Sequence, residues 1–305
     1  MTVVYHSGPD MEASSTEFSV FRGGLGVARE IGPNVLAFGK FDGLHVGHRE
    51  LIARSAQAAQ RLGLPFGVAT FERHPYSHLR PGSAPPLLTG LAQKLRLFRE
   101  AGARFAALFS ADSSVLGVSA EDFTKAVLRD RMTTRVVVVG ESFQFGRGGA
   151  GDISTIHRLA PTTGVDGVEV GTVTVAGLPV SASRIRARLA TGDIDLVNEL
   201  LGRPYEVPGT VTVADRVSAM VAASAGRALP GPGIYSARIL VTCRRHDPAL
   251  CCRVEVDRTD ADDPRLVARW VEREMRGPPP RGPVILTFDA KLSDNPSRRT
   301  RQPGA

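Results

Sequence analysis

From Asn34 onward the chain alternates short apolar runs with amphipathic segments, and this alternation restricts the folds that it can adopt. Val35–Phe38 is a short apolar run. In the segment 49–62 that follows, apolar residues recur at the 3.6-residue period of a helix, and Gly63 is placed to end it. The same order of strand, loop and helix recurs up to the β-branched run at 135–139. Short links between alternating strands and helices predict an α/β fold with an open parallel sheet and right-handed crossovers.

The polar and glycine-rich loops of this region come directly after the expected strands. They span residues 39–48, 71–90 and 140–152. Open parallel sheets bind ligands beyond the carboxyl ends of their strands. We therefore expect a ligand site built from these three loops.

The pattern changes after residue 202. Four short runs then favour strands, at 209–214, 233–242, 252–257 and 284–288, and an apolar stripe predicts one helix at Pro264–Met275. We expect a first domain at 1–202, a smaller and mostly β domain at 203–292, and a disordered basic tail at 293–305. Residues 1–30 indicate an irregular lead-in with one edge strand.

Composition narrows the environment of the chain. Its apolar fraction of 42% and charged fraction of 23% are typical of globular proteins. No apolar run is long enough to span a membrane, and Met1–Asp10 lacks the layout of a signal peptide. The three cysteines lack metal-ligand spacing, so we expect a cytoplasmic protein. The net charge of +7 comes from dispersed residues, which favours anionic small ligands over nucleic acid.

The segment Gly39–His48 carries the clearest chemical pattern: Gly-Lys-Phe-Asp-Gly-Leu-His-Val-Gly-His. It leaves the first expected strand and enters the first expected helix, where free backbone N–H groups and the helix dipole favour phosphate. His45 and His48 can donate to phosphate oxygens there, while Gly43 and Gly47 let the backbone approach a ligand closely. The alternative interpretation is two surface histidines in a turn, and the strand, loop and helix context favours the phosphate site.

A second polar pattern lies at Ser181-Ala-Ser-Arg-Ile-Arg186. Hydroxyls, free N–H groups and guanidinium groups at a helix start suit a triphosphate. Alone, this pattern favours a plain N-cap at Ser183 and a solvated basic face for the arginines, whereas beside His45 and His48 it favours the phosphate site. In the loop after 139, Phe143 and Phe145 fit either core packing or stacking on a flat ring, and the residues leave both open.

Five segments, in order and over residues 34–205, resemble the His-x-Gly-His nucleotidylyltransferases and, more closely, the bifunctional riboflavin kinase/FAD synthetases. They are Gly39–His48, Thr70–Pro75, Leu88-Thr89 with Lys94, Val139–Gly146 with Gly151-Asp152, and Ser181–Arg186. The resemblance implies a Rossmann-like nucleotidylyltransferase domain followed by a barrel-like domain. It further implies transfer of AMP from ATP to FMN, aided by Mg²⁺, to give FAD and pyrophosphate.

The resemblance also assigns expected roles. The catalytic residues would be His45, His48, Arg184 and Arg186; the nucleotide-binding residues Gly39, Phe41, Asp42, Gly43, Gly47, Gly140, Ser181 and Ser183; and the flavin-binding residues Phe71, His74, Pro75, Ser142, Phe143 and Phe145. No metal site made by the protein alone is expected. The expected partners are the nucleotide and a flavin-like acceptor, without a membrane, and a homo-oligomer remains open.

The sequence departs from the family at several positions. Ser142 stands where Asn or Asp is common, and Ala182 replaces a hydroxyl residue. Between Gly209 and Tyr235 the kinase motif Gly-x-Pro-Thr-Ala-Asn is missing, so we expect no riboflavin kinase activity. Two alternatives stay open: nucleotidyl transfer with another acceptor or NTP in a specialised pathway, and a non-catalytic flavin- or RNA-binding regulator. The intact histidine pair disfavours the regulator.

Overall fold

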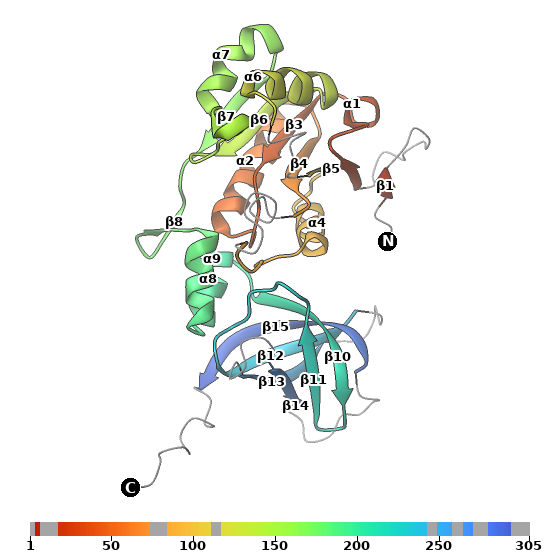
Figure 1. Ribbon diagram of the computed structural model, residues 1–305, viewed down its shortest axis with the longest axis vertical. Coiled ribbons are helices and arrows are strands. Elements are labelled where there is room, and N and C mark those ends of the chain that lie inside the picture. Colours follow the sequence, from red (N-terminus) through yellow and green to blue (C-terminus); the bar gives the residue numbers. More distant parts are fainter. Residues whose placement is uncertain are drawn as a thin grey trace. The chain divides into compact units, whose positions relative to one another are not determined.

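The computed structural model describes residues 4–6, 18–73, 84–110, 117–242, 249–257, 265–270 and 280–293. The chain divides into two compact units (Figure 1). The sheet unit comprises residues 1–85 and 90–179, and the barrel unit comprises 86–89 and 180–305. In the described part of the chain, no helix is both long and apolar enough to cross a membrane.

The sheet unit is built on a parallel sheet, as the alternating pattern predicts. Its described strands follow the order β1-β2-β5-β4-β3-β6-β7, and every neighbouring pair is parallel. The strands are β1 (Val4–His6), β2 (Ser19–Arg22), β3 (Asn34–Phe38), β4 (Phe66–Phe71), β5 (Phe105–Phe109), β6 (Thr134–Gly140) and β7 (Asp166–Val170). This arrangement confirms the predicted α/β fold.

Helices cover both faces of this sheet (Figure 1). They are α1 (Val27–Glu30), α2 (Val46–Leu62), α4 (Leu91–Glu100), α6 (Ala120–Asp122) continued by the π-helix η1 (Phe123–Arg131), the 3₁₀ turn η2 (Arg147–Gly149) and α7 (Ile153–Thr163). Alternate residues of β3 enter two separate cores. Val35 and Ala37 pack with α2 and α4, whereas Leu36 and Phe38 pack with η1 and α7. A strand buried on both faces explains why β3 reads as a continuous apolar run.

The sequence pattern predicted an irregular segment with one edge strand at residues 1–30, and the structure has two strands there. β1 and β2 are both strands, and β2 lies inside the sheet between β1 and β5. Val20 and Phe21 of β2 are fully buried. A strand of four residues is too short to show a clear period, which is why the sequence pattern missed it.

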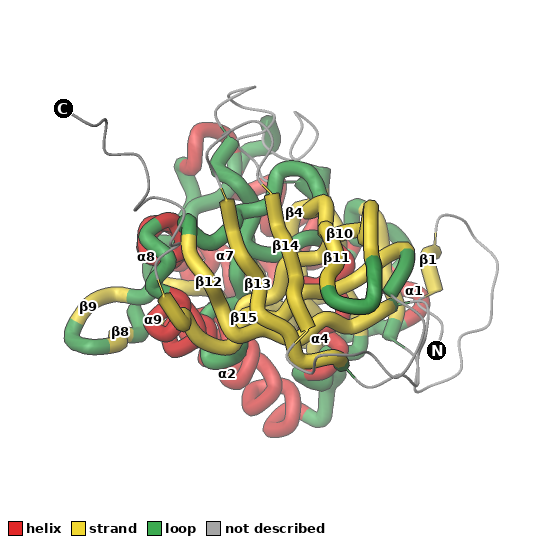
Figure 2. Tube along the Cα trace, turned by 90° about the horizontal axis from the view of Figure 1, so that it is seen from below, coloured by secondary structure: helices red, strands yellow, loops and turns green. Residues whose placement is uncertain are grey.

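The barrel unit contains a closed antiparallel barrel, which confirms the predicted smaller β domain (Figure 2). The order of the strands is β10-β11-β14-β13-β12-β15. They are β10 (Tyr205–Ala214), β11 (Ser218–Ala223), β12 (Gly233–Val241), β13 (Leu250–Asp257), β14 (Arg265–Trp270) and β15 (Gly282–Ser293). A short hairpin of the sheet unit, β8 (Thr174–Val175) with β9 (Leu178–Pro179), precedes this unit in sequence.

The predicted helix at Pro264–Met275 is wrong, because residues 265–270 form strand β14. Leu266 and Ala268 are buried while Arg265 and Arg269 are exposed, which is the two-residue alternation of a strand. The apolar stripe in the sequence is also compatible with a short helix. Residues 265–270 adopt the strand conformation because they pair with β11 and β13. The remaining residues of the predicted helix and the tail after 293 lie outside the described residues.

Two helices of the barrel unit, α8 (Ala182–Ala190) and α9 (Ile194–Leu201), precede the barrel strands. Asn198 of α9 donates its amide hydrogens to the carbonyls of Phe288 and Asp289, at 3.0 and 3.1 Å, and its Oδ1 accepts from the backbone N–H of Tyr205 at 2.8 Å. These bonds fix α9 on the barrel. The functional boundary at residue 202 stays a prediction.

Two adjacent cysteines of β13 should differ strongly in reactivity. Cys251 is exposed, whereas Cys252 is buried, and this burial raises the pKa of the Cys252 thiol to about 12. Because the thiolate is the reactive form, we expect iodoacetamide at pH 8 to modify Cys251 at least ~10-fold faster than Cys252. Peptide mass spectrometry measures both rates, and unfolding in denaturant should abolish the difference. Equal rates in the folded protein would contradict the described packing of β13.

Candidate functional site

The loop from Gly39 to His45 connects β3 to α2 through an unusual backbone path. Phe41, Gly43 and Leu44 have φ values of 50°, 84° and 39°. A left-handed conformation at a non-glycine residue costs about 1–3 kcal/mol and persists only where the surroundings enforce it. The side chains of Phe41 and Leu44 are both buried in the core beneath the loop. The packing of these two side chains therefore stabilises left-handed conformations that are unfavourable for the backbone by itself.

Phe41 supports the loop from below. Its ring makes edge contacts with the rings of Phe98 and His48, with centroids 5.3 and 5.2 Å apart. A Cβ atom on Gly39 would lie 3.3 Å from the same ring. The predicted nucleotide residues Gly39, Phe41, Asp42 and Gly43 thus share one loop, with Asp42 also buried. Because the Phe41 ring faces the core, its side chain shapes the loop, and the backbone is the part that can meet a ligand.

The two histidines lie against each other at the start of α2. His45 is the N-cap residue, and its Nδ1 accepts from the backbone N–H of His48 at 3.4 Å. The two imidazole rings stack with centroids 3.7 Å apart and planes inclined by 17°. An Nδ1 that accepts leaves Nε2 of His45 to carry the proton. The positive end of a 17-residue helix thus coincides with two imidazoles that can donate to an anion.

Gly47 makes this stacking possible. A Cβ atom at this position would lie 3.2 Å from Nδ1 and 3.3 Å from Cε1 of His45. Such contacts are tighter than side chains normally tolerate, so a larger residue would push the His45 ring away. The glycine of the His-x-Gly-His pattern therefore has a steric reason within the site itself.

Two residues of the family segments, to which the sequence analysis gave no role of their own, hold this loop. The hydroxyl of Thr70 donates to the carbonyl of Lys40 at 3.1 Å, and the ammonium of Lys94 donates to the same carbonyl at 2.7 Å. Thr70 is fully buried in β4, and Lys94 is buried in α4. The available signal was a lysine among the buried residues of a helix, where lysine is rarely found.

The predicted flavin residues Phe71, Phe143 and Phe145 join one aromatic cluster around Phe38. The centroid of the Phe38 ring lies 6.3 Å from that of Phe71 and 5.2 Å from that of Phe143, and the Phe143 ring stacks on Phe145 with centroids 5.4 Å apart. Phe145 is buried and packs on Phe123 of η1, so core packing accounts for it. Phe71 and Phe143 are half-buried and line the carboxyl ends of the central strands. The predicted residues His74 and Pro75 lie outside the described residues.

The loop after β6 is fixed at both of its ends. The carboxylate of Glu141 accepts from the backbone N–H and the hydroxyl of Thr172, at 3.2 and 2.8 Å. Phe145 and Gly151 exchange two backbone hydrogen bonds of 2.9 Å. Between these points Ser142 is exposed, and a Cβ atom on Gly140 would meet open space. The structure thus leaves both predicted residues accessible.

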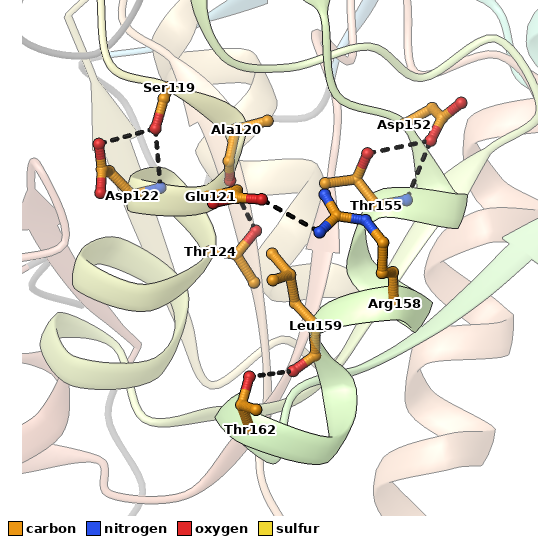
Figure 3. Close-up of polar contacts among 10 residues, drawn as sticks. All are labelled: Ser119, Ala120, Glu121, Asp122, Thr124, Asp152, Thr155, Arg158, Leu159 and Thr162. Atoms are coloured by element: carbon orange, nitrogen blue, oxygen red, sulfur yellow. Dashed lines mark hydrogen bonds and ion pairs between the residues drawn. The ribbon is translucent and has the colours of Figure 1, made fainter.

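Asp152, which follows this loop, is a helix cap (Figure 3). Its Oδ1 accepts from the hydroxyl of Ser154 at 2.6 Å and from the backbone N–H of Thr155 at 3.0 Å, and these bonds lower the pKa of the carboxyl. One turn further along α7, Arg158 pairs with Glu121 of α6 at 3.0 Å (Figure 3). These contacts give Asp152 a structural role at the start of α7.

The predicted phosphate residues after 180 lie in the first turns of α8, in the barrel unit. Ser181 is the N-cap, and its side chain accepts from the backbone N–H of Arg184 at 3.2 Å. Nε of Arg186 donates to the carbonyl of Pro86 at 2.7 Å. Ser183, expected as the alternative cap, is instead an exposed residue inside the first turn. The structure thus gathers two hydroxyls and two guanidinium groups at one helix start.

Comparison with known proteins identifies the family. Residues 28–184 match the FAD synthetase family, a range that contains the histidine pair, the aromatic cluster around Phe38 and the start of α8. The chain is 28% identical over 212 residues to the bifunctional riboflavin kinase/FMN adenylyltransferase of Escherichia coli K12, with 68% of each chain covered. It is 29% identical over 222 residues to the Bacillus subtilis protein of the same name, with 70% of this chain and 69% of the relative covered.

One solved structure shares the fold of both units. A protein from Streptococcus pneumoniae, described as a macrolide-efflux protein, matches with a TM-score of 0.76 at 21% identity, over 90% of this chain and 91% of that chain. At this identity the likeness concerns the fold alone. The match over residues 28–184 covers more than half of the sequence, and the chain belongs to the FAD synthetase family.

Proposed function

We propose that this protein is an FMN adenylyltransferase, which transfers AMP from ATP to FMN and releases pyrophosphate. The observation that carries the proposal is the stacked pair His45–His48 at the start of α2, within the residues that match the FAD synthetase family. The curated relatives named above are FMN adenylyltransferases by name. Membership of the family and the chemistry of this loop support the same reaction.

The reaction needs alignment and charge stabilisation, without a covalent enzyme intermediate. A phosphate oxygen of FMN attacks the α-phosphorus of ATP, the bond from that phosphorus to the bridging oxygen breaks, and pyrophosphate leaves with the electron pair. Charge develops on the oxygens around the α-phosphorus and on the leaving group. We assign the imidazole donors of His45 and His48, together with the positive end of α2, to the oxygens around the α-phosphorus.

The start of α8 suits the leaving group. Arg184, Arg186, Ser181 and Ser183 supply charged and neutral donors of the kind that binds a pyrophosphate. Mg²⁺ fits this chemistry as a companion of the triphosphate, since Mg²⁺ is usually held by substrate phosphates and one or two carboxylates. No group of three His, Cys, Asp or Glu side chains among the described residues forms a ready metal site.

We assign the flavin to the aromatic cluster at the strand ends. The half-buried rings of Phe71 and Phe143 can pack against the isoalloxazine, and Phe145 supports them from the core. The exposed Ser142 belongs to the same loop as Phe143, and we keep Gly140, at the end of β6, for the nucleotide. His74 and Pro75 are proposed for the same region from the resemblance alone.

We further propose that the barrel unit lacks riboflavin kinase activity. Where the kinase motif would be expected, the chain makes a tight turn between β10 and β11. Oδ1 of Asp215 accepts from the backbone N–H groups of Val217 and Ser218, at 2.8 and 2.6 Å, which lowers the pKa of this carboxyl. Two carbonyls that follow β11, those of Ala228 and Gly231, accept hydrogen bonds from the buried hydroxyls of Tyr205 and Tyr235, at 2.7 and 2.6 Å. The Asp215 carboxylate and these two carbonyls thus serve the barrel itself.

Purified protein incubated with FMN, ATP and Mg²⁺ should form FAD and pyrophosphate in equal amounts. Chromatography with mass detection measures FAD, and a coupled assay measures pyrophosphate. Parallel incubations replace ATP with other NTPs and FMN with other phosphorylated acceptors. Pyrophosphate formed only with another pair of substrates would assign the chain to a different nucleotidyl transfer. Binding of FMN without pyrophosphate under any condition would favour the regulator and contradict the proposal.

A further inference from the structure

We propose that Thr70 and Lys94 are positioning residues that hold the peptide bond between Lys40 and Phe41 and thereby place the histidine pair. The proposal rests on the proposed function where it concerns adenylyl transfer. It starts from two donors on one carbonyl: the hydroxyl of Thr70 at 3.1 Å and the ammonium of Lys94 at 2.7 Å from the oxygen of Lys40.

The two donors come from two different rigid elements. Thr70 lies in β4, whose neighbours in the sheet are β3 and β5. Lys94 lies in the first turn of α4, beside the buried Leu95 on the helix that packs on this face of the sheet. A carbonyl held from a strand and from a helix cannot rotate without breaking both bonds. One of these is a charge-assisted bond, which is stronger than a neutral one.

The held carbonyl lies directly before one of the two left-handed non-glycine residues of the loop. Rotation of the peptide plane between Lys40 and Phe41 changes ψ of the first residue and φ of the second. Phe41 has a φ of 50°, an unfavourable value for a bulky residue. Fixing the carbonyl therefore fixes the left-handed conformation that directs the Phe41 ring inward.

The Phe41 ring transmits this position to the catalytic pair. It contacts the ring of His48 at 5.2 Å, and His48 stacks on His45 at 3.7 Å. If Phe41 returned to an extended conformation, the support beneath His48 would be lost. Displacement of a catalytic group by about 1 Å can cost ~100-fold in rate, so a modest shift of this loop should be visible in kcat.

The exchange of Thr70 for Val tests the positioning role because Val keeps the shape and lacks the donor. We expect Thr70→Val to lower kcat for FAD formation ~10-fold while KM for ATP and FMN changes less than ~3-fold. Thr70→Ser, which keeps a hydroxyl, should recover most of the loss. Lys94→Met should lower kcat by at least as much, again with a small change in KM. A large increase in KM for ATP with unchanged kcat would make these residues substrate ligands and overturn the proposal.

Thr163→Val provides a matched control in the same unit. The Thr163 side chain is buried, donates to the carbonyl of Leu159 at 2.9 Å and accepts from the N–H of Val165 at 3.2 Å. The Thr163→Val variant therefore loses at least as many hydrogen bonds as Thr70→Val. It loses them at the end of α7, whereas Thr70→Val loses its bond to the loop before α2. We expect its kcat to remain within ~2-fold of the wild type. A loss equal to that of Thr70→Val would show a general effect of destabilisation and overturn the positioning role.

Hydrogen exchange gives a measurement that does not depend on activity. In the protein without nucleotide, Thr70→Val should speed exchange of the amides in residues 40–48 by ~10-fold, while peptides from α7 stay unchanged and Thr70→Ser restores protection. If the wild type makes no FAD but the exchange behaves in this way, the proposed function fails and the positioning role stands. Unchanged exchange in residues 40–48 of Thr70→Val would overturn the positioning role whatever the activity.

Discussion

His48→Ala is expected to lower kcat for FAD formation by about 10²–10³-fold, with a much smaller effect on ATP binding. Removal of a donor that acts mainly on charge developing in the transition state has an effect of this size. The imidazole of His48 stacks on His45 and rests on Phe41, so alanine removes both a donor and the surface that orients its partner. Initial rates of FAD formation over a range of ATP concentrations separate kcat from KM.

His157→Ala is the matched control for this experiment. His157 is an exposed residue of α7, and its Nε2 lies 3.0 Å from the carbonyl of Gly167. The His157→Ala substitution therefore removes an imidazole that makes a polar contact. This imidazole belongs to the same unit as His48 and lies outside the loop before α2. Its kcat should equal that of the wild type. If His48→Ala also kept the wild-type kcat, the histidine pair would be a structural cap of α2.

The second large effect is the expected absence of riboflavin kinase activity. With riboflavin, ATP and Mg²⁺, we expect FMN formation at less than ~1% of the rate of adenylyl transfer. The family resemblance implies that the missing Thr and Asn would hold the metal and the phosphates, and the loss of both alignment and charge neutralisation removes several kcal/mol of catalysis. The stretch 214–230 contains Asp215 as its only carboxylate and no Asn, and that carboxylate closes the turn before β11.

The bifunctional Escherichia coli relative is the positive control, because its name includes both activities. Chromatography of flavins separates riboflavin, FMN and FAD in one run. Both proteins are compared at equal rates of FAD formation from added FMN, so that a weak preparation cannot imitate a missing kinase. Formation of FMN from riboflavin at a rate comparable to that of adenylyl transfer would show that other residues of the barrel replace the motif.

Periodicity predicted the elements whose burial follows one simple pattern. The central strands of the sheet are buried on both faces and read as apolar runs, and α2 shows a regular apolar stripe ended by Gly63. β14 was mistaken for a helix, because a six-residue strand in a closed barrel alternates only a few times. β2 was missed for a similar reason, since its place in the sheet is set by pairing with β5 and not by its four residues.

In the candidate site, too, contacts between residues close in the sequence could be predicted, whereas contacts between distant residues could not. His45 and His48 are three residues apart at a helix start, so local capping geometry brings them together, with Gly47 leaving room for the His45 ring. The hold on Lys40 joins residues 30 and 54 positions apart, and only the pairing of β3 with β4 and the packing of α4 create it. For Phe145, the sequence left core packing and flavin stacking open, and the structure places the side chain in the core.

Transfer of labelled phosphorus from ATP tests the central claim most directly. The protein is incubated with FMN and ATP that carries a radioactive phosphorus at either the α or the γ position, and the flavins are separated from the phosphates. An FMN adenylyltransferase attaches the α-phosphorus to the flavin and releases the γ-phosphorus in pyrophosphate. We therefore expect FAD to carry the α label and pyrophosphate to carry the γ label. Unlabelled flavin with α-labelled ATP, or a flavin that carries the γ label, would contradict the proposed function.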